Sequence, residues 1–258
     1  MKIQTSAFCC TRNGLTIRGY EYRPEGGRLP IAIVSHGFMA NQRSVRQYVR
    51  RLAQWGYAAY CFDFCGGCIV GKSDGRTTDM TVFTEQADLE AVVHYAKALP
   101  YTDASHIILM GCSQGGFVSA LAAAKLRKEI RKLVLFYPAL CIPDDARSGK
   151  MMFAKFKPSN IPEVIQCGLM RLGREYAASV LGVDPYAAIA PYPGPVLIVH
   201  GTRDNIVDPK YAEQAAAAYE QSAANRCELV LLENAGHGFS RKDDARAIPI
   251  IQRFLLDS

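Results

Sequence analysis

The segment Ile107-Ile108-Leu109-Met110-Gly111-Cys112-Ser113-Gln114-Gly115-Gly116 carries the strongest structural signal in the sequence. An apolar run leads to a serine with a glycine two residues before it and another two residues after it, and the alanine-rich run 117–126 follows. This G-x-S-x-G pattern predicts a sharp turn from a buried strand into a helix, with the Ser113 hydroxyl raised above the sheet edge. The glycines suit such a turn because a Cβ at either position would crowd it. Ser113 is therefore a candidate nucleophile in an α/β fold.

A serine hydroxyl is a weak nucleophile unless a base and an orienting acid accompany it. In proteins with this turn, the acid and then the histidine follow the serine along the chain. His237 follows Ser113 in a polar, glycine-flanked loop, and we predict that it is the general base. The acid is expected just after the apolar run 195–199, where Asp204 and Asp208 are both candidates. Asp204 is favoured because it is nearer the strand end, whereas Asp208 precedes a proline and resembles a helix N-cap.

Two backbone N–H groups are expected to stabilise an oxyanion beside Ser113. The apolar run 31–35 ends in His36-Gly37-Phe38, where the chain can turn the Phe38 N–H toward the serine. The second donor is the N–H of Gln114, which lies at the N-terminus of the expected helix, where partial positive charge collects.

Strand and helix patterns alternate along most of the chain. Residues 3–10 and 15–22 predict an N-terminal hairpin, and further strands are expected at 31–35, 57–62, 107–110, 133–137, 195–199 and 228–232. Helical patterns separate them, and Pro249 is expected either to start or to kink the last helix. This alternation predicts a mostly parallel central sheet with helices on both faces, formed by residues 1–141 and 191–258. Reactive residues are then expected beyond the carboxyl ends of the strands.

Residues 142–190 interrupt the alternation. They are rich in proline, methionine and aromatic residues, and a helical pattern extends over about 169–181. We predict a small inserted lid, or cap, over an apolar substrate. A helical excursion packed on the core explains the pattern equally well, and both interpretations stay open.

The composition is that of a globular protein with one α/β domain. The chain has 258 residues, of which 49% are hydrophobic and 21% charged, and a formal net charge of +6. No nucleic-acid motif accompanies the positive charge. No apolar run is long enough for a signal peptide or a membrane span, so we expect a cytoplasmic protein without a membrane partner. The nine cysteines are expected to be reduced thiols.

Two further motifs in the segment 65–73 are typical of other kinds of site. Cys65-Gly66-Gly67-Cys68 lacks a second cysteine pair at zinc spacing, so no metal site is predicted. The segment 66–73 matches the phosphate-binding pattern G-x-x-x-x-G-K-S, which requires a helix to begin at Lys72. Weak helix formers follow instead, and the first helix is expected only near Thr81 or Phe83. A nucleotide-binding protein is therefore a remote alternative.

Several short motifs match one known group of enzymes. They are Ser35-His36-Gly37-Phe38, Phe62-Asp63-Phe64, Lys72-Ser73-Asp74-Gly75, the Ser113 turn, Tyr137-Pro138-Ala139, Ile161-Pro162 and His200-Gly201-Thr202. With them the chain resembles, over nearly its whole length, the α/β-hydrolases and in particular the small intracellular cinnamoyl (feruloyl) esterases of gut bacteria. The resemblance implies an inserted lid whose aspartate and tyrosine contact the phenolic hydroxyl of the substrate. The matching positions are Asp145 and Tyr176.

The chain departs from that family at two places. A longer segment, Cys65 to Gly71, replaces a Gly-His-Gly sequence, and an expected lid glutamine is replaced near Met152. Neither change touches Ser113, Asp204 or His237.

We therefore expect a serine carboxylesterase that forms an acyl-enzyme on a small-molecule ester, with feruloyl-type esters as candidate substrates, and that needs no cofactor. A peptidase, thioesterase or acyltransferase using the same residues stays open, as does a homodimer.

Overall fold

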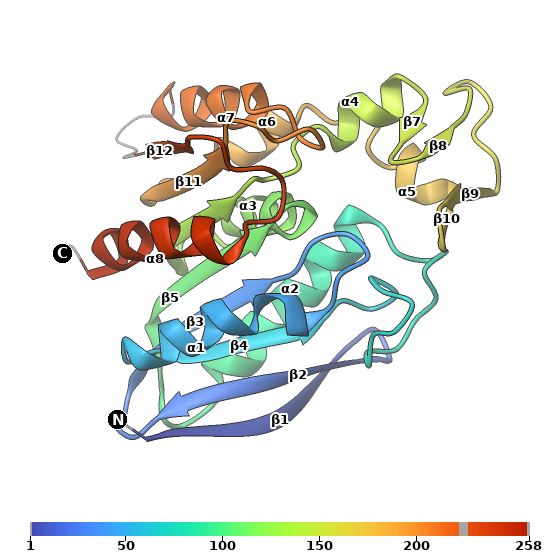
Figure 1. Cartoon of the computed structure of the whole chain (residues 1–258). Coiled ribbons are helices and arrows are strands. Elements are labelled where there is room, and N and C mark those ends of the chain that lie inside the picture. The colour runs from blue at the N-terminus through green and yellow to red at the C-terminus, as the bar shows by residue number, and fades with distance from the viewer. Residues whose placement is uncertain (1, 222–226, 257–258) are drawn as a thin grey trace.

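The computed structural model describes residues 2–221 and 227–256. Within these residues, eight strands form one sheet in the order β1-β2-β4-β3-β5-β6-β11-β12 (Figure 1). They are β1 (Ile3–Arg12), β2 (Leu15–Pro24), β3 (Leu29–Ser35), β4 (Ala58–Asp63), β5 (Thr102–Cys112), β6 (Ile130–Phe136), β11 (Val196–Gly201) and β12 (Cys227–Leu232). β2 pairs antiparallel with both β1 and β4, and the other neighbours pair parallel. The predicted α/β fold with a mostly parallel sheet is confirmed.

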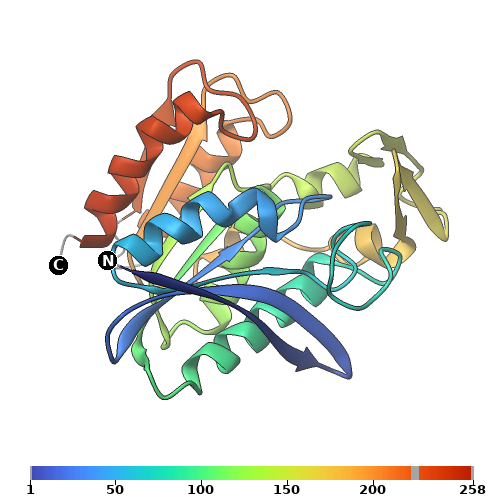
Figure 2. The same cartoon turned by 60° about the horizontal axis from the view of Figure 1, so that its bottom comes forward.

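Helices cover both faces of the sheet (Figures 1 and 2). α1 (Arg46–Gln54) and α8 (Arg241–Leu256) cover one face, and α2 (Val82–Lys97), α3 (Gln114–Lys125) and α7 (Lys210–Gln221) cover the other. Alternate residues of a strand serve the two cores: in β3, Ala32 and Val34 pack with α1 and α8, while Ile31 and Ile33 pack with α2 and α3. A strand covered on both faces has to be apolar throughout, which is why these strands are continuous apolar runs.

The strands β3, β5, β6, β11 and β12 run in the same direction, so their carboxyl ends meet at one edge of the sheet. The loops that carry Phe38, Ser113, Asp204 and His237 follow β3, β5, β11 and β12 at this edge. A parallel α/β sheet binds ligands in the crevice outside these ends.

Residues 142–190 contain short elements that project from one end of the sheet (Figure 2). They are α4 (Ile142–Arg147), β7 (Lys150–Met151), β8 (Ala154–Lys155), β9 (Val164–Cys167), β10 (Met170–Gly173), α5 (Arg174–Ala178) and α6 (Pro185–Ile189). The helical pattern expected over 169–181 is correct for α5 but wrong for its first residues, which form β10, the second strand of a hairpin with β9. Burial alternates there at Ile165, Cys167, Met170 and Leu172, and Gly168 makes the turn with a φ of 62°. This two-residue period is that of a half-buried strand.

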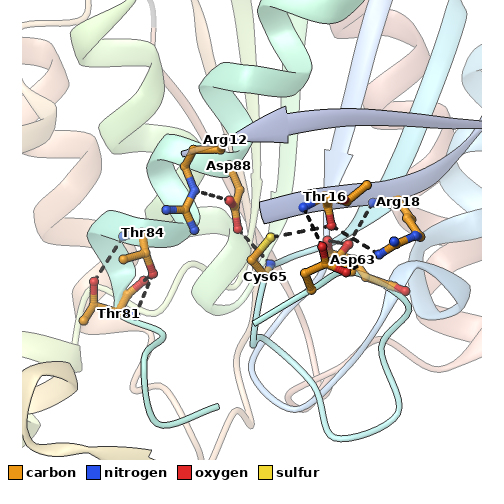
Figure 3. Close-up of polar contacts among 10 residues, drawn as sticks. Arg12, Thr16, Arg18, Asp63, Cys65, Thr81, Thr84 and Asp88 are labelled. Atoms are coloured by element: carbon orange, nitrogen blue, oxygen red, sulfur yellow. Dashed lines mark hydrogen bonds and ion pairs between the residues drawn. The ribbon is translucent and has the colours of Figure 1, made fainter. Parts of the chain in front are cut away.

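The segment 66–73 is a loop and not the start of a helix. The Lys72 N–H donates to Asp63 Oδ2 over 2.8 Å, and the Ser73 hydroxyl donates to the Asp63 backbone carbonyl, so the polar groups of this loop bind the end of β4. α2 begins at Val82 after an N-cap at Thr81, whose side chain and backbone exchange hydrogen bonds with Thr84 (Figure 3). The expected helix start near Thr81 is confirmed, and Lys72 lies in the loop that precedes this helix.

The structure also bears on the predictions for Pro249, for the cysteines and for a membrane span. Pro249 lies inside α8, which begins at Arg241, so the expectation that it starts the helix is wrong. All nine cysteines fall within the described residues and are free thiols. None of the helices in the described ranges has both the length and the apolar character required to cross a bilayer.

A buried ion pair joins β1 to α2. The Arg12 guanidinium donates from Nε to Asp88 Oδ1, and the Cys65 N–H donates to Asp88 Oδ2 over 2.8 Å (Figure 3). The Asp88 side chain has no exposed surface and that of Arg12 is 14% exposed. One carboxylate therefore connects the N-terminal hairpin, α2 and the start of the loop after β4.

We predict that Asp88→Ala lowers the free energy of unfolding by about 3 kcal/mol, because it leaves a mostly buried guanidinium and the Cys65 N–H without their acceptor. Glu90→Ala is the matched control: Glu90 lies on the same helix and pairs with Lys125, whose side chain is 61% exposed. The control should lose less than about 1 kcal/mol. Urea unfolding of both variants measures the difference, and equal losses would contradict the role given to Asp88.

Candidate active site

Ser113 lies in a tight turn between β5 and α3, as the sequence predicts. Its backbone has a φ of 55° and a ψ of −123°, a strained conformation for a residue with a side chain. An ideal Cβ on Gly111 would lie 2.1 Å from the Gly115 carbonyl oxygen, and one on Gly115 would lie 2.2 Å from the His36 carbonyl oxygen. Both positions therefore require glycine. The turn holds the serine hydroxyl at the carboxyl edge of the sheet.

The structure brings Ser113, His237 and Asp204 into direct contact. His237 Nε2 lies 2.9 Å from Ser113 Oγ, and His237 Nδ1 lies 2.7 Å from Asp204 Oδ2. An ionised carboxylate only accepts hydrogen bonds, so Nδ1 donates to Asp204 and Nε2 is left to accept from the serine hydroxyl. Asp208 instead accepts from the Lys210 N–H over 3.0 Å at the start of α7, consistent with an N-cap. Of the two candidate acids, Asp204 alone contacts His237 among the described residues.

Asp204 is held in its ionised form by several donors. The N–H groups of Ile206 and Val207 each donate to its Oδ1 over 2.9 Å. Burial alone would raise the pKa of this carboxyl, but hydrogen bonds from His200, His237 and Val207 outweigh it, so the pKa of Asp204 lies below its ordinary value. The carboxylate is thus charged across the physiological pH range and orients the His237 ring.

His200 is a contact of this site that sequence reasoning missed. Because His200 ends an apolar run and precedes a glycine, the sequence predicts only a backbone role at a strand end, and its Nε2 does lie 3.0 Å from the Val207 carbonyl oxygen. The same Nε2 also lies 3.1 Å from Asp204 Oδ2, and the ring is fully buried. One feature of the sequence could have indicated this contact. His200 and Asp204 are four residues apart at the end of a buried strand, close enough for their side chains to meet.

The two candidate oxyanion donors lie beside Ser113. Phe38 and Gln114 line the same small pocket as the serine. The loop that carries Phe38 comes close because Gly37 has no side chain: an ideal Cβ there would lie 3.0 Å from Ser113 Cβ. Gln114 is the first residue of α3, so its N–H belongs to the open first turn of that helix.

The two lid residues implied by the family resemblance line this pocket as well. Asp145 comes from α4 and Tyr176 from α5. Ala139, Cys141, Ile142, Met151, Met152, Ile206 and Val207 complete the lining. Burial raises the pKa of both Asp145 and Tyr176. The cavity volume of about 40 Å³ holds a few water molecules, so a bulky acyl group enters only when partly exposed lining side chains such as Met152 and Ile206 move.

A buried polar chain runs from α2 to the pocket and was not found from the sequence. Gln114 Nε2 donates to Glu85 Oε2 over 2.7 Å, and the Tyr176 hydroxyl donates to Gln114 Oε1. Burial raises the pKa of Glu85 to about 8, against the opposing effect of the Gln114 hydrogen bond. In the sequence, Glu85 resembles an ordinary acidic residue in a first helical turn.

No metal centre is apparent at the site. Across residues 2–221 and 227–256, no group of three or more His, Cys, Asp or Glu side chains is placed to hold a metal ion.

The fold and the arrangement of these residues define an α/β-hydrolase. A family model described as "Serine aminopeptidase, S33" matches residues 29–179, more than half of the chain. The chain belongs to this family of α/β-hydrolases. A model of the prolyl oligopeptidase family matches residues 151–257. A comparison with curated proteins found no match.

Solved structures with this fold include esterases. A structure of Est1E from Butyrivibrio proteoclasticus with bound ferulic acid is 29% identical, with a TM-score of 0.88 over 96% of this chain and 98% of that one. A second Est1E structure is 27% identical, with a TM-score of 0.83 over 97% and 98%. An esterase from Pyrococcus furiosus shares the fold at 18% identity, with a TM-score of 0.73 over 98% and 90%.

We predict that the wild-type free energy of unfolding, relative to that of Glu85→Gln, falls as the pH rises from about 5 to about 8. In the unfolded chain this carboxyl is ionised above about pH 4.3. In the folded protein its raised pKa keeps it protonated, so unfolding releases a proton within this window and stability decreases with pH. The slope is at most about 1.4 kcal/mol per pH unit. Urea unfolding at several pH values tests this, and a difference that is constant with pH would contradict the burial of an ionisable Glu85.

Proposed function

We propose that the protein is a serine carboxylesterase in which Ser113 is the nucleophile, His237 the general base and Asp204 the orienting acid. The observation that carries this proposal is the unbroken hydrogen-bond chain from the Ser113 hydroxyl through His237 to Asp204. Membership of an α/β-hydrolase family and similarity to esterase structures support the choice of an ester as substrate.

The reaction proceeds through an acyl-enzyme. His237 Nε2 accepts the proton of Ser113 as Oγ attacks the ester carbonyl, and the negative charge that develops on the carbonyl oxygen is stabilised by the N–H groups of Phe38 and Gln114. His237 then donates the proton to the leaving alcohol. A water molecule, activated by the same imidazole, attacks the acyl-enzyme and releases the acid. Asp204 keeps the imidazole in the tautomer that can accept from Ser113 and stabilises it when it becomes charged.

Hydroxycinnamate esters of the feruloyl type are the proposed substrates. Est1E, which is 29% identical over almost the whole chain, has been solved with ferulic acid. Asp145 and Tyr176 give the pocket beside Ser113 two polar groups in an otherwise largely apolar lining, a combination suited to an aromatic acyl group with a phenolic hydroxyl. In this proposal residues 142–190 are a lid, and Met152 moves aside when the acyl group enters.

A peptidase is the second candidate function. The family model that matches residues 29–179 is described as a serine aminopeptidase, and the second model is that of prolyl oligopeptidases. The same three side chains can cleave an amide, so the identity of the leaving group has to be measured.

We predict that Ser113→Ala lowers kcat for 4-nitrophenyl butyrate by at least about a thousandfold, because it removes the nucleophile while the fold is retained. Ser119→Ala is the matched control, since Ser119 is a buried serine in α3, the helix that follows Ser113, and it should hydrolyse the ester like wild type.

A full burst of nitrophenol from Ser113→Ala would refute the assignment of the nucleophile. Parallel assays with aminoacyl and prolyl nitroanilides identify the bond. Faster turnover of a nitroanilide than of every ester tested would favour the peptidase.

We predict that Tyr176→Phe and Asp145→Ala each lower kcat/KM for ethyl ferulate about tenfold relative to 4-nitrophenyl acetate, because each removes a polar contact to the phenolic hydroxyl that acetate lacks. Tyr186→Phe is the control: Tyr186 donates to Gln214 and does not line the pocket. Steady-state kinetics on both esters measures the ratio. Equal losses on ferulate and acetate would count against a phenol-binding role for the two residues.

A further inference from the structure

Two consecutive buried hydrogen bonds connect Glu85 to Gln114 and Gln114 to Tyr176, and this row of side chains ends at the pocket beside Ser113. It joins three elements of the fold, α2, α3 and α5. Glu85 and Gln114 are each 1% exposed and Tyr176 is 2% exposed. Water therefore does not compete for these groups, and each bond constrains the next one.

The direction of the donors along this row determines what Tyr176 can offer to a ligand. Glu85 Oε2 accepts from the Gln114 amide nitrogen, so the amide oxygen of Gln114 points toward Tyr176 and accepts its hydroxyl proton. A phenol has one proton to donate. Burial raises the pKa of Tyr176, so it keeps that proton. Its oxygen therefore remains available to a ligand in the pocket as an acceptor.

We propose that Glu85 is a positioning residue that sets the hydrogen-bonding polarity of the acyl pocket, so that the pocket selects acyl groups carrying a hydroxyl donor over those carrying an ether oxygen. The proposal rests on the ester-hydrolase function proposed above and adds a residue outside the pocket lining that determines its selectivity. If Glu85 could not accept, the Gln114 amide would be free to turn its NH₂ group toward Tyr176. The tyrosine proton would then be available for the pocket, which could bind an ether oxygen as well.

The chemistry of Glu85 supplies a conservative replacement. Its raised pKa of about 8 means that the carboxyl is largely protonated, and so uncharged, at neutral pH, with the proton on Oε1 and Oε2 left to accept from Gln114. A glutamine at this position has nearly the same shape, is neutral and retains an oxygen that can accept from Gln114. A leucine has a similar volume and cannot accept.

The test is the binding of free 4-hydroxycinnamic acid and 4-methoxycinnamic acid, measured by isothermal titration calorimetry at neutral pH. Wild type should bind the hydroxylated acid at least about tenfold more tightly, the effect of one buried hydrogen bond. Glu85→Leu should reduce this preference severalfold, because Asp145 is then the remaining acceptor for the hydroxyl, and Glu85→Gln should keep the wild-type preference. Glu90→Gln, on the same helix but outside the pocket, is the control and should behave as wild type.

Gln114→Met interrupts the same row one residue further along and replaces Glu85→Leu if that variant does not fold, as judged by thermal unfolding. Equal binding of both acids by wild type, or a wild-type preference retained in folded Glu85→Leu or Gln114→Met, would overturn the proposal. Since the ligands are acids and not esters, these results do not depend on turnover. Failure of the esterase function appears separately, in the kinetics of Ser113→Ala.

Discussion

The turn at Ser113 is the constraint on which the rest of the site depends. The polypeptide changes from strand to helix at a single residue with a positive φ, and backbone packs closely on both sides of this turn. An ideal Cβ on Gly111 would lie 2.1 Å from the Gly115 carbonyl oxygen, and one on Gly115 would lie 2.2 Å from the His36 carbonyl oxygen. This close packing brings the loop after β3 against the start of α3. In the proposed mechanism, one local arrangement of backbone therefore positions the serine hydroxyl and the two proposed oxyanion donors, the N–H groups of Phe38 and Gln114.

Two buried carboxyl groups on either side of this turn have opposite electrostatic environments. Asp204 receives hydrogen bonds from two backbone N–H groups and lies within hydrogen-bonding distance of two histidines, so its pKa is lowered despite burial. Glu85 is buried against the side-chain amide of Gln114, and its pKa is raised to about 8. The first environment favours a charge that orients His237, and the second favours a neutral group that orients Gln114. In the proposed functions, two similar side chains serve catalysis and selectivity because different donors surround them.

Most of the fold follows from local sequence patterns. Apolar runs, helical spacing and the glycines around Ser113 predict the strands, the main helices and the loops of the candidate triad, because these features depend on periods of two or 3.6 residues and on turn sterics. Strand β10 was expected to be helical because Leu169, Leu172 and Tyr176 follow one another at helical spacing, so this short run fits a helix as well as a strand. His200 and Glu85 could not be assigned from the sequence, since their roles depend on contacts between elements, and Glu85 lies 29 residues from Gln114.

The central claim is that Ser113 is made nucleophilic by His237. The most direct measurement is covalent labelling with a fluorophosphonate, followed by intact-mass analysis and peptide mapping. The account predicts one added phosphonyl group on Ser113 in the wild-type protein, and labelling slowed at least about a hundredfold in a folded His237→Ala variant, because the base that takes the serine proton is gone. Labelling of another residue, or undiminished labelling of Ser113 without His237, would contradict it.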